Sequence, residues 1–143
     1  MRVAEMMHTP VVTCRPSARM GEVARLMRDR NVGAVLVVDE VGYLAGIVTD
    51  RDLAVRGIGA GRTADAAVEH VMSRDVATVP LDSDVAHAGE VMAKRMVRRL
   101  PVVDEGGNPS GMVTLDDLVR HLGEETDALV DTVVLQAARR PFV

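Results

Sequence analysis

The sequence is poor in aromatic residues, and this deficit excludes one broad class of partner. Tyr43 and Phe142 are the only aromatic residues among 143, and tryptophan is absent. Proteins that bind single-stranded nucleic acids usually stack the bases on aromatic rings. A formal net charge of -4 also disfavours contact with a phosphate backbone. We therefore expect no nucleic-acid partner.

Cysteine is almost absent as well, because Cys14 is the only one and no disulfide can form within the chain. A thiol in a predicted strand is usually a small buried apolar group. A redox or metal-sensing role would need an exposed thiol with a lowered pKa. The histidines show no short metal-ligand spacing to support such a role. They are His8, His70, His87 and His121.

Long apolar runs are missing too, and the N-terminus has neither the apolar core nor the cleavage site of a signal peptide. With 48% hydrophobic and 27% charged residues, the composition is that of a globular protein. We expect a cytoplasmic protein without a membrane partner. No nucleophile–base pair, metal cluster or carboxylate dyad is evident, so we do not expect an enzyme.

What the sequence does contain is a duplication. The segment "GIVTDRDL" at Gly46 returns as "GMVTLDDL" at Gly111, an offset of 65 residues, and "VVDEVG" returns as "VVDEGG" at the same offset. A period of this size indicates a duplicated supersecondary unit. We place one repeat at 1–61 and the other at 62–123, followed by a C-terminal helix and tail over 124–143.

Each repeat predicts a leading helix followed by a β-α-β-β-α unit, which is an α/β (α+β) fold. Apolar positions recur at helical spacing in the long helices over 17–31 and 83–97, where methionine is most simply core filler. In the first helix, the apolar face comprises Met20, Val23, Ala24 and Met27, and in the second Val85, Ala88, Met92 and Met96. Ser17 and either Ser83 or Asp82 are the expected N-caps.

The repeated element Thr-x-x-Asp, at a strand-to-helix junction, has two interpretations. The simpler one is a capping box, although Asp is shorter than the usual Glu or Gln and should reach back less well. In the other, the threonine hydroxyl and the carboxylate bind a phosphate and a ribose, whose adjacent hydroxyls suit a carboxylate acceptor. Small residues at Gly46 and Gly111 would let a ligand approach the backbone.

The pattern of a strand, Gly-apolar-x-Thr-x-x-Asp and a helix, with "VRRLPVVD" before its second copy, resembles a tandem pair of CBS domains, or Bateman module. The stretches "TDRDLAVRG" and "GAVLVVD" are similar to small stand-alone CBS pairs of the hypoxic-response type. The resemblance covers about Val3 to Gly123. It implies two repeats packed with approximate twofold symmetry, a homodimer, and clefts for AMP, ADP, ATP, S-adenosylmethionine or sometimes NAD, with no required cofactor.

The resemblance also assigns residues to the two clefts. It carries the ribose and phosphate positions onto Thr49 with Asp52 and onto Thr114 with Asp117. Adenine is usually held by strand backbone and apolar side chains in this family. The corresponding residues are Val12, Thr13, Ala34 and Val35 in the first repeat, and Ala77, Thr78, Leu100 and Pro101 in the second.

The two clefts should differ in charge. Arg98 and Arg99 stand in the second repeat where the first has Gly33 and Ala34, and a polyphosphate needs cationic partners. Lys94 and Arg95 are more simply a solvated helix face.

We therefore expect an adenosyl-ligand sensor that acts through an effector protein, its own dimer or the C-terminal helix, since no effector domain is attached. The alternative is an interaction scaffold with empty or vestigial clefts, which Gly33 and Ala34 favour for the first cleft.

Overall fold

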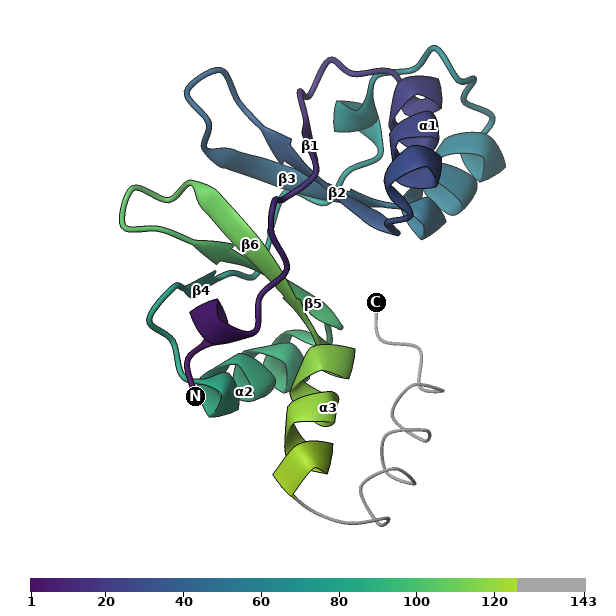
Figure 1. Cartoon of the computed structure of the whole chain (residues 1–143). Coiled ribbons are helices and arrows are strands. Elements are labelled where there is room, and N and C mark those ends of the chain that lie inside the picture. Colours follow the sequence, from purple (N-terminus) through teal and green to yellow (C-terminus); the bar gives the residue numbers. More distant parts are fainter. Residues whose placement is uncertain (126–143) are drawn as a thin grey trace. The chain divides into compact units, whose positions relative to one another are not determined.

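The computed structural model describes residues 1–125, which form two compact units (Figure 1). The first unit comprises Pro10–Val76 with Gly106–Pro109. The second unit comprises Met1–Thr9, Ala77–Glu105 and the described residues from Ser110 onward. Each unit contains one three-stranded sheet.

The first unit is built on a sheet of order β1-β2-β3, in which β1 is parallel to β2 and β2 antiparallel to β3. Its strands are β1 (Thr13–Cys14), β2 (Ala34–Val38) and β3 (Leu44–Thr49). Its helix is α1 (Met20–Arg30), and its shorter helical segments are η2 (Asp52–Gly57), η3 (Ile58–Ala60) and η4 (Val68–His70).

The second unit repeats this plan, with a sheet of order β4-β5-β6 and β4 parallel to β5. Its strands are β4 (Val79–Pro80), β5 (Arg99–Val103) and β6 (Pro109–Thr114). Its helices are η1 (Val3–Glu5), α2 (Val85–Arg95) and α3 (Leu115–Glu125). The α+β class and the order of elements predicted from the sequence are confirmed.

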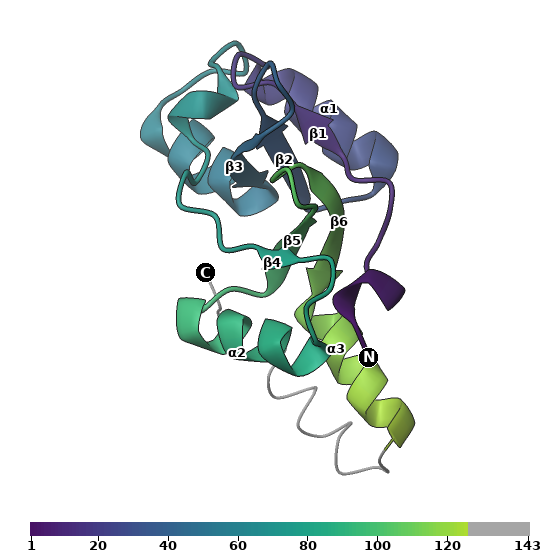
Figure 2. The same cartoon turned by 90° about the vertical axis from the view of Figure 1, so that its left-hand side faces the viewer.

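The leading segment of each sequence repeat packs in the unit of the other repeat. Met1–Thr9 precedes the first repeat's strands but belongs to the second unit, and η4 belongs to the first unit. Figure 2 shows the N-terminal turn η1 near α2 and α3, and the amide of Val3 donates to the carbonyl of Ser83 at 2.8 Å. Packing units and sequence repeats therefore differ by an exchange of their leading segments.

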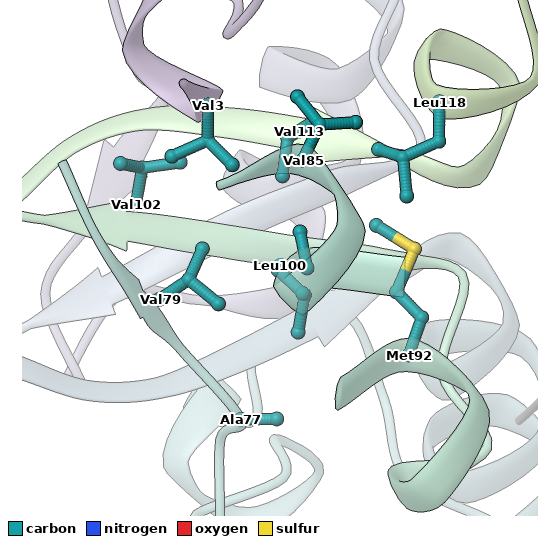
Figure 3. Packing of buried hydrophobic residues seen from close by; sticks show 10 residues of the cluster. Val3, Ala77, Val79, Val85, Met92, Leu100, Val102, Val113 and Leu118 are labelled. Atoms are coloured by element: carbon teal, nitrogen blue, oxygen red, sulfur yellow. The ribbon is translucent and has the colours of Figure 1, made fainter. Parts of the chain in front are cut away.

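The core of the second unit joins the leading segment to the sheet and both helices (Figure 3). Leu100 and Val102 are two apart in β5 and point to the same face of the sheet, because side chains alternate along a strand. The buried members of this cluster are Val3, Ala77, Val79, Val85, Ala88, Met92, Leu100, Val102, Val113 and Leu118.

The core of the first unit is likewise made of aliphatic side chains and methionine. Val35 and Val37 of β2 face a layer made by α1, η2 and η4. Its buried members are Met20, Val23, Met27, Val35, Val37, Val48, Leu53, Val68, Val71 and Met72. Burial of Met20, Met27 and, in the second unit, Met92 confirms that these methionines fill the cores.

The predicted N-caps are wrong, for a reason that the sequence does not contain. Helix α1 starts at Met20, and its first amides are satisfied by backbone: Met20 and Gly21 donate to the carbonyls of Ala66 and Ala64, both at 2.9 Å. The cap of α2 is Asp84, whose Oδ1 accepts from the amide of Ala86 at 2.7 Å. Because a neighbouring segment supplies the acceptors, α1 needs no side-chain cap.

Two residues predicted to lie on the buried apolar faces of the long helices are exposed. Ala24 is exposed in α1. Met96 follows α2 in a left-handed conformation (φ 55°) and is 53% exposed. The predicted C-terminal helix, with Leu129, Val130, Val133 and Val134, lies outside the described residues except for its first two positions. Within residues 1–125, no helix is long and apolar enough to span a bilayer.

Candidate functional site

The junction of β3 and η2 is held by a reciprocal pair of hydrogen bonds. The amide of Thr49 donates to Oδ2 of Asp52 at 2.9 Å, and the amide of Asp52 donates to Oγ1 of Thr49 at 3.1 Å. This is the geometry of a capping box. Aspartate therefore reaches back to the amide of Thr49, although its shorter side chain was expected to do so less well than Glu or Gln. The other carboxylate oxygen, Oδ1, lies 3.8 Å from the guanidinium of Arg56.

The junction of β6 and α3 repeats this arrangement with two additional bonds. The amide and the hydroxyl of Thr114 both donate to Oδ2 of Asp117 at 2.8 Å, and the amide of Asp117 donates to Oγ1 of Thr114 at 3.3 Å. Oδ1 of Asp117 is hydrogen-bonded to Nε2 of His8 at 2.8 Å. Both oxygens of Asp117 therefore have partners, and its side chain is only 8% exposed.

These partners change the acidity of Asp117. Burial by itself would raise the pKa of this carboxyl group, since a buried carboxylate is poorly solvated. The hydrogen bonds from His8 and Thr114 outweigh burial and lower the pKa of Asp117 below its ordinary value. Asp117 is therefore a charged, nearly buried acceptor at neutral pH.

The glycines that precede the two junctions make room for protein. A Cβ on Gly46 would lie 2.7 Å from Sδ of Met72 and 2.8 Å from the carbonyl oxygen of Ser73. A Cβ on Gly111 would overlap Sδ and Cγ of Met7. The expectation that these glycines leave space for a ligand is therefore wrong, because the leading segments fill the space above them.

The two arginines that distinguish the second repeat, Arg98 and Arg99, lie at the start of β5, beside the Thr114–Asp117 junction. The carbonyl of Arg98 accepts from the amide of Leu115 at 2.8 Å, and its guanidinium lies 3.6 Å from Asp116. Arg99 is the partly buried first residue of β5. In the first unit, the carbonyl of Gly33 accepts the equivalent bond from Asp50 at 3.0 Å. Lys94 and Arg95 are exposed in the last turn of α2.

The residues proposed for adenine lie on strands next to the junctions. In the first unit, Ala34 pairs with Thr49 across the sheet, and the carbonyl of Val12 accepts from the amide of Leu36 at 3.0 Å. Thr13 is exposed, whereas Thr78, which precedes β4, is partly buried. Fully or nearly fully buried side chains are those of Val35, Ala77, Leu100 and Pro101. These four could offer a ligand little beyond their backbone groups.

Cys14 packs at the edge of the first core, as the sequence indicated. Burial raises the pKa of its thiol to about 11, so the thiolate is scarce at neutral pH. Among residues 1–125, no group of three or more histidine, cysteine or acidic side chains is arranged to hold a metal ion. The scarcity of thiolate weighs against a thiol sensor at Cys14.

Two matches to a family model account for the duplicated junction. The model of the CBS domain matches residues 3–57 and 68–124. The chain belongs to the CBS-domain family. The resemblance drawn from the Thr-x-x-Asp repeats is confirmed, and CBS pairs are generally regulatory modules.

Relatives of this CBS pair include small proteins of similar length. It is 40% identical to the CBS domain-containing protein YhcV of Bacillus subtilis over 116 residues, 81% of each chain. It is 30% identical to hypoxic response protein 1 of Mycobacterium tuberculosis over 121 residues, 84% of each chain. Other relatives are longer: the chain spans 61% of one from Methanopyrus kandleri, and 23% of an L-aspartate semialdehyde sulfurtransferase from Methanocaldococcus jannaschii.

The fold is also that of solved CBS pairs. The CBS pair of protein MJ0100, solved in complex with 5′-methylthioadenosine and S-adenosylmethionine, superposes with a TM-score of 0.79 at 28% identity. The superposition covers 88% of this chain and 98% of that one.

One residue of the second junction, His8, is not evident from the Thr-x-x-Asp pattern. His8 was considered only as a metal ligand, yet its side chain lies on Asp117, 109 residues away along the chain. The offset of 65 pairs His8 with Ser73. This polar difference between the two repeats is the signal that could have drawn attention to it.

Proposed function

We propose that this CBS pair is a sensor of adenosine-containing ligands, with one site at Thr49 and Asp52 and another at Thr114 and Asp117. The observation that carries the proposal is the Thr–Asp junction itself, formed twice with the same backbone hydrogen bonds. A CBS pair of the same fold, that of MJ0100, binds two adenosine derivatives, which supports the same class of ligand for this protein.

The geometry suits a ribose diol. In the first junction, Oδ2 of Asp52 is used by the turn, while within residues 1–125 Oδ1 has only the long contact to Arg56 at 3.8 Å. An ionised carboxylate is acceptor-only, and adjacent ribose hydroxyls are donors. The hydroxyl of Thr49 accepts from Asp52 and keeps its own proton for a ligand oxygen.

Phosphate groups would find different surroundings in the two sites. In the second, Arg98 and Arg99 at the start of β5 would bind a phosphate, and Arg98 would exchange its contact with Asp116 for it. In the first, Arg56 is a cation beside the junction. We therefore propose AMP, ADP, ATP and S-adenosylmethionine as candidate ligands.

A ligand regulates only if it binds two states of the protein with different affinity. We propose that occupancy changes the affinity of this CBS pair for an effector protein or for a second copy of the chain.

The test is direct binding measured by calorimetry, together with thermal unfolding in the presence of AMP, ADP, ATP, S-adenosylmethionine and NAD. A ligand at about a hundred times its dissociation constant stabilises the folded state by roughly 2.7 kcal/mol. For a domain of this size, we expect a shift of several degrees. Asp52→Ala and Asp117→Ala should each remove the binding of one equivalent.

Because both aspartates also hold a turn, a matched control is needed. Asp84→Ala removes the exposed cap of α2 without touching either junction. It should lower the melting temperature while leaving every dissociation constant unchanged. Loss of binding in the Asp84 variant would show that instability, and not a missing ligand contact, explains the other variants.

The second candidate function is an interaction scaffold whose junctions are purely structural. The observation that favours it is the saturation of Asp117 by Thr114 and His8. A panel without binding to any of the five ligands would support the scaffold and overturn the sensor.

A further inference from the structure

The side chain of His8 is hydrogen-bonded to Oδ1 of Asp117. Backbone pairing with β6 fixes the position of His8. The amide of His8 donates to the carbonyl of Met112 at 2.8 Å, and the amide of Met112 donates back at 3.1 Å. This short antiparallel bridge places the leading segment along β6. From there, Nε2 of His8 reaches Oδ1 of Asp117 at 2.8 Å.

The first unit has the same backbone bridge but a different side chain. Ile47 and Ser73 exchange two amide–carbonyl bonds, both of 2.9 Å, and they correspond to Met112 and His8 at the offset of 65. The hydroxyl of Ser73 accepts from Arg56 at 3.4 Å. Among the described residues, Asp52 has no partner on Oδ1 at hydrogen-bond distance, and its side chain is 16% exposed.

We propose that His8 makes the two sites unequal: the Asp52 site binds a ribose directly, and the Asp117 site binds one only when His8 is displaced. This inference depends on the proposed function, since it concerns ligand preference at the same sites. It reverses the order suggested by the arginines, which favoured the second cleft on charge alone.

Competition between His8 and a ribose follows from the chemistry of the carboxylate. Oδ2 of Asp117 already accepts two bonds from Thr114, so the diol must use Oδ1. A ribose hydroxyl then replaces a hydrogen bond to a charged group, which is among the stronger bonds in proteins. Thr114 is committed as well, because its hydroxyl proton is donated to Asp117.

His8 can be replaced without loss of core packing, since its side chain is 63% exposed. The matched substitution is His8→Ser, which installs the residue found at position 73. The reverse substitution is Ser73→His, which brings an imidazole to the bridge beside Asp52. Together they exchange the one side-chain difference that the inference invokes.

The experiment is calorimetric titration with AMP, repeated with S-adenosylmethionine, in backgrounds that isolate one site. Asp52→Ala leaves only the Asp117 site. In that background, His8→Ser should lower the dissociation constant about tenfold, which corresponds to about 1.4 kcal/mol of binding free energy. In the Asp117→Ala background, His8→Ser should change nothing, and Ser73→His should weaken binding about tenfold.

The outcomes separate this inference from the proposed function. If His8→Ser leaves the Asp117 site unchanged or weakens it while both probes still bind, the sensor stands and the competition is overturned. If neither probe binds the wild type or any variant, the proposed function fails and the inference falls with it. In the Asp52→Ala background, a shift of the NMR signal of the His8 imidazole on addition of AMP would support the displacement of His8 from Asp117.

Discussion

Thr114 and Asp117 are joined by three hydrogen bonds, two of which end on the same carboxylate oxygen. The pair caps the start of α3, and it leaves Oδ1 facing His8. Stability and the proposed ligand binding therefore depend on the same two residues.

Asp117→Asn should destabilise the protein at neutral pH by about 1.5–3 kcal/mol, because a charged acceptor is lost from the hydrogen-bonded pair. The pKa of Asp117 is lower in the folded protein than its ordinary value of 3.8, so its carboxylate contributes stability above that value. This contribution disappears as the pH falls through the folded-state pKa. Urea unfolding of the wild type and of Asp117→Asn should show the difference between their free energies of unfolding narrowing from pH 7 to below pH 3.

The control for this substitution is Asp65→Asn, at a side chain that is 84% exposed and pairs only loosely with Arg19. Asp65→Asn should change the free energy of unfolding by no more than about 0.5 kcal/mol across the same pH range. A stability difference for Asp117→Asn that is independent of pH would contradict the assignment.

Gly46→Ala should destabilise the first unit by about 1–3 kcal/mol, because a Cβ there meets the backbone oxygen of Ser73 at 2.8 Å. Gly111→Ala should cost less, since the obstacle is the flexible side chain of Met7. Gly123→Ala, in α3 with no described residue within 4 Å of the added Cβ, is the control and should be neutral or slightly stabilising. Equal effects of all three in urea unfolding would refute the close approach of the leading segments.

Asn31 and Met96 end α1 and α2 in the same left-handed conformation, with φ of 53° and 55°. Asparagine tolerates this conformation, whereas methionine is strained in it. We expect Met96→Asn to stabilise the protein by about 0.5–1 kcal/mol and Asn31→Met to destabilise it by at least as much. Changes of the opposite sign in either variant would mean that side-chain packing, rather than backbone strain, governs these ends.

Cys14 should react slowly with a thiol reagent at neutral pH. Its pKa is raised from 9.0 to about 11, so about a hundredfold less thiolate is present than for an exposed cysteine. Labelling with Ellman's reagent at pH 7 should accelerate strongly when urea unfolds the chain. Equally rapid labelling of the folded protein would instead revive a redox role for this thiol.

Much of this protein was determined by local sequence. The duplication, the order of helices and strands, and the Thr-x-x-Asp junctions all follow from patterns along the sequence. Such patterns are decided by periodicity and short-range hydrogen bonding. The bonds between Thr49 and Asp52 span three residues, so the sequence could predict them as a cap.

Only the tertiary structure decided what surrounds those junctions. Contact between His8 and Asp117 joins residues 109 positions apart, and no local pattern encodes it. The same holds for the backbone caps that Ala64 and Ala66 supply to α1, and for Met7 and Met72 above the two glycines. All of these contacts are made by the leading segments, each of which packs in the unit of the other repeat. There the segments bury apolar side chains in a core whose other members lie far away along the sequence, so only folding brings the contacts together.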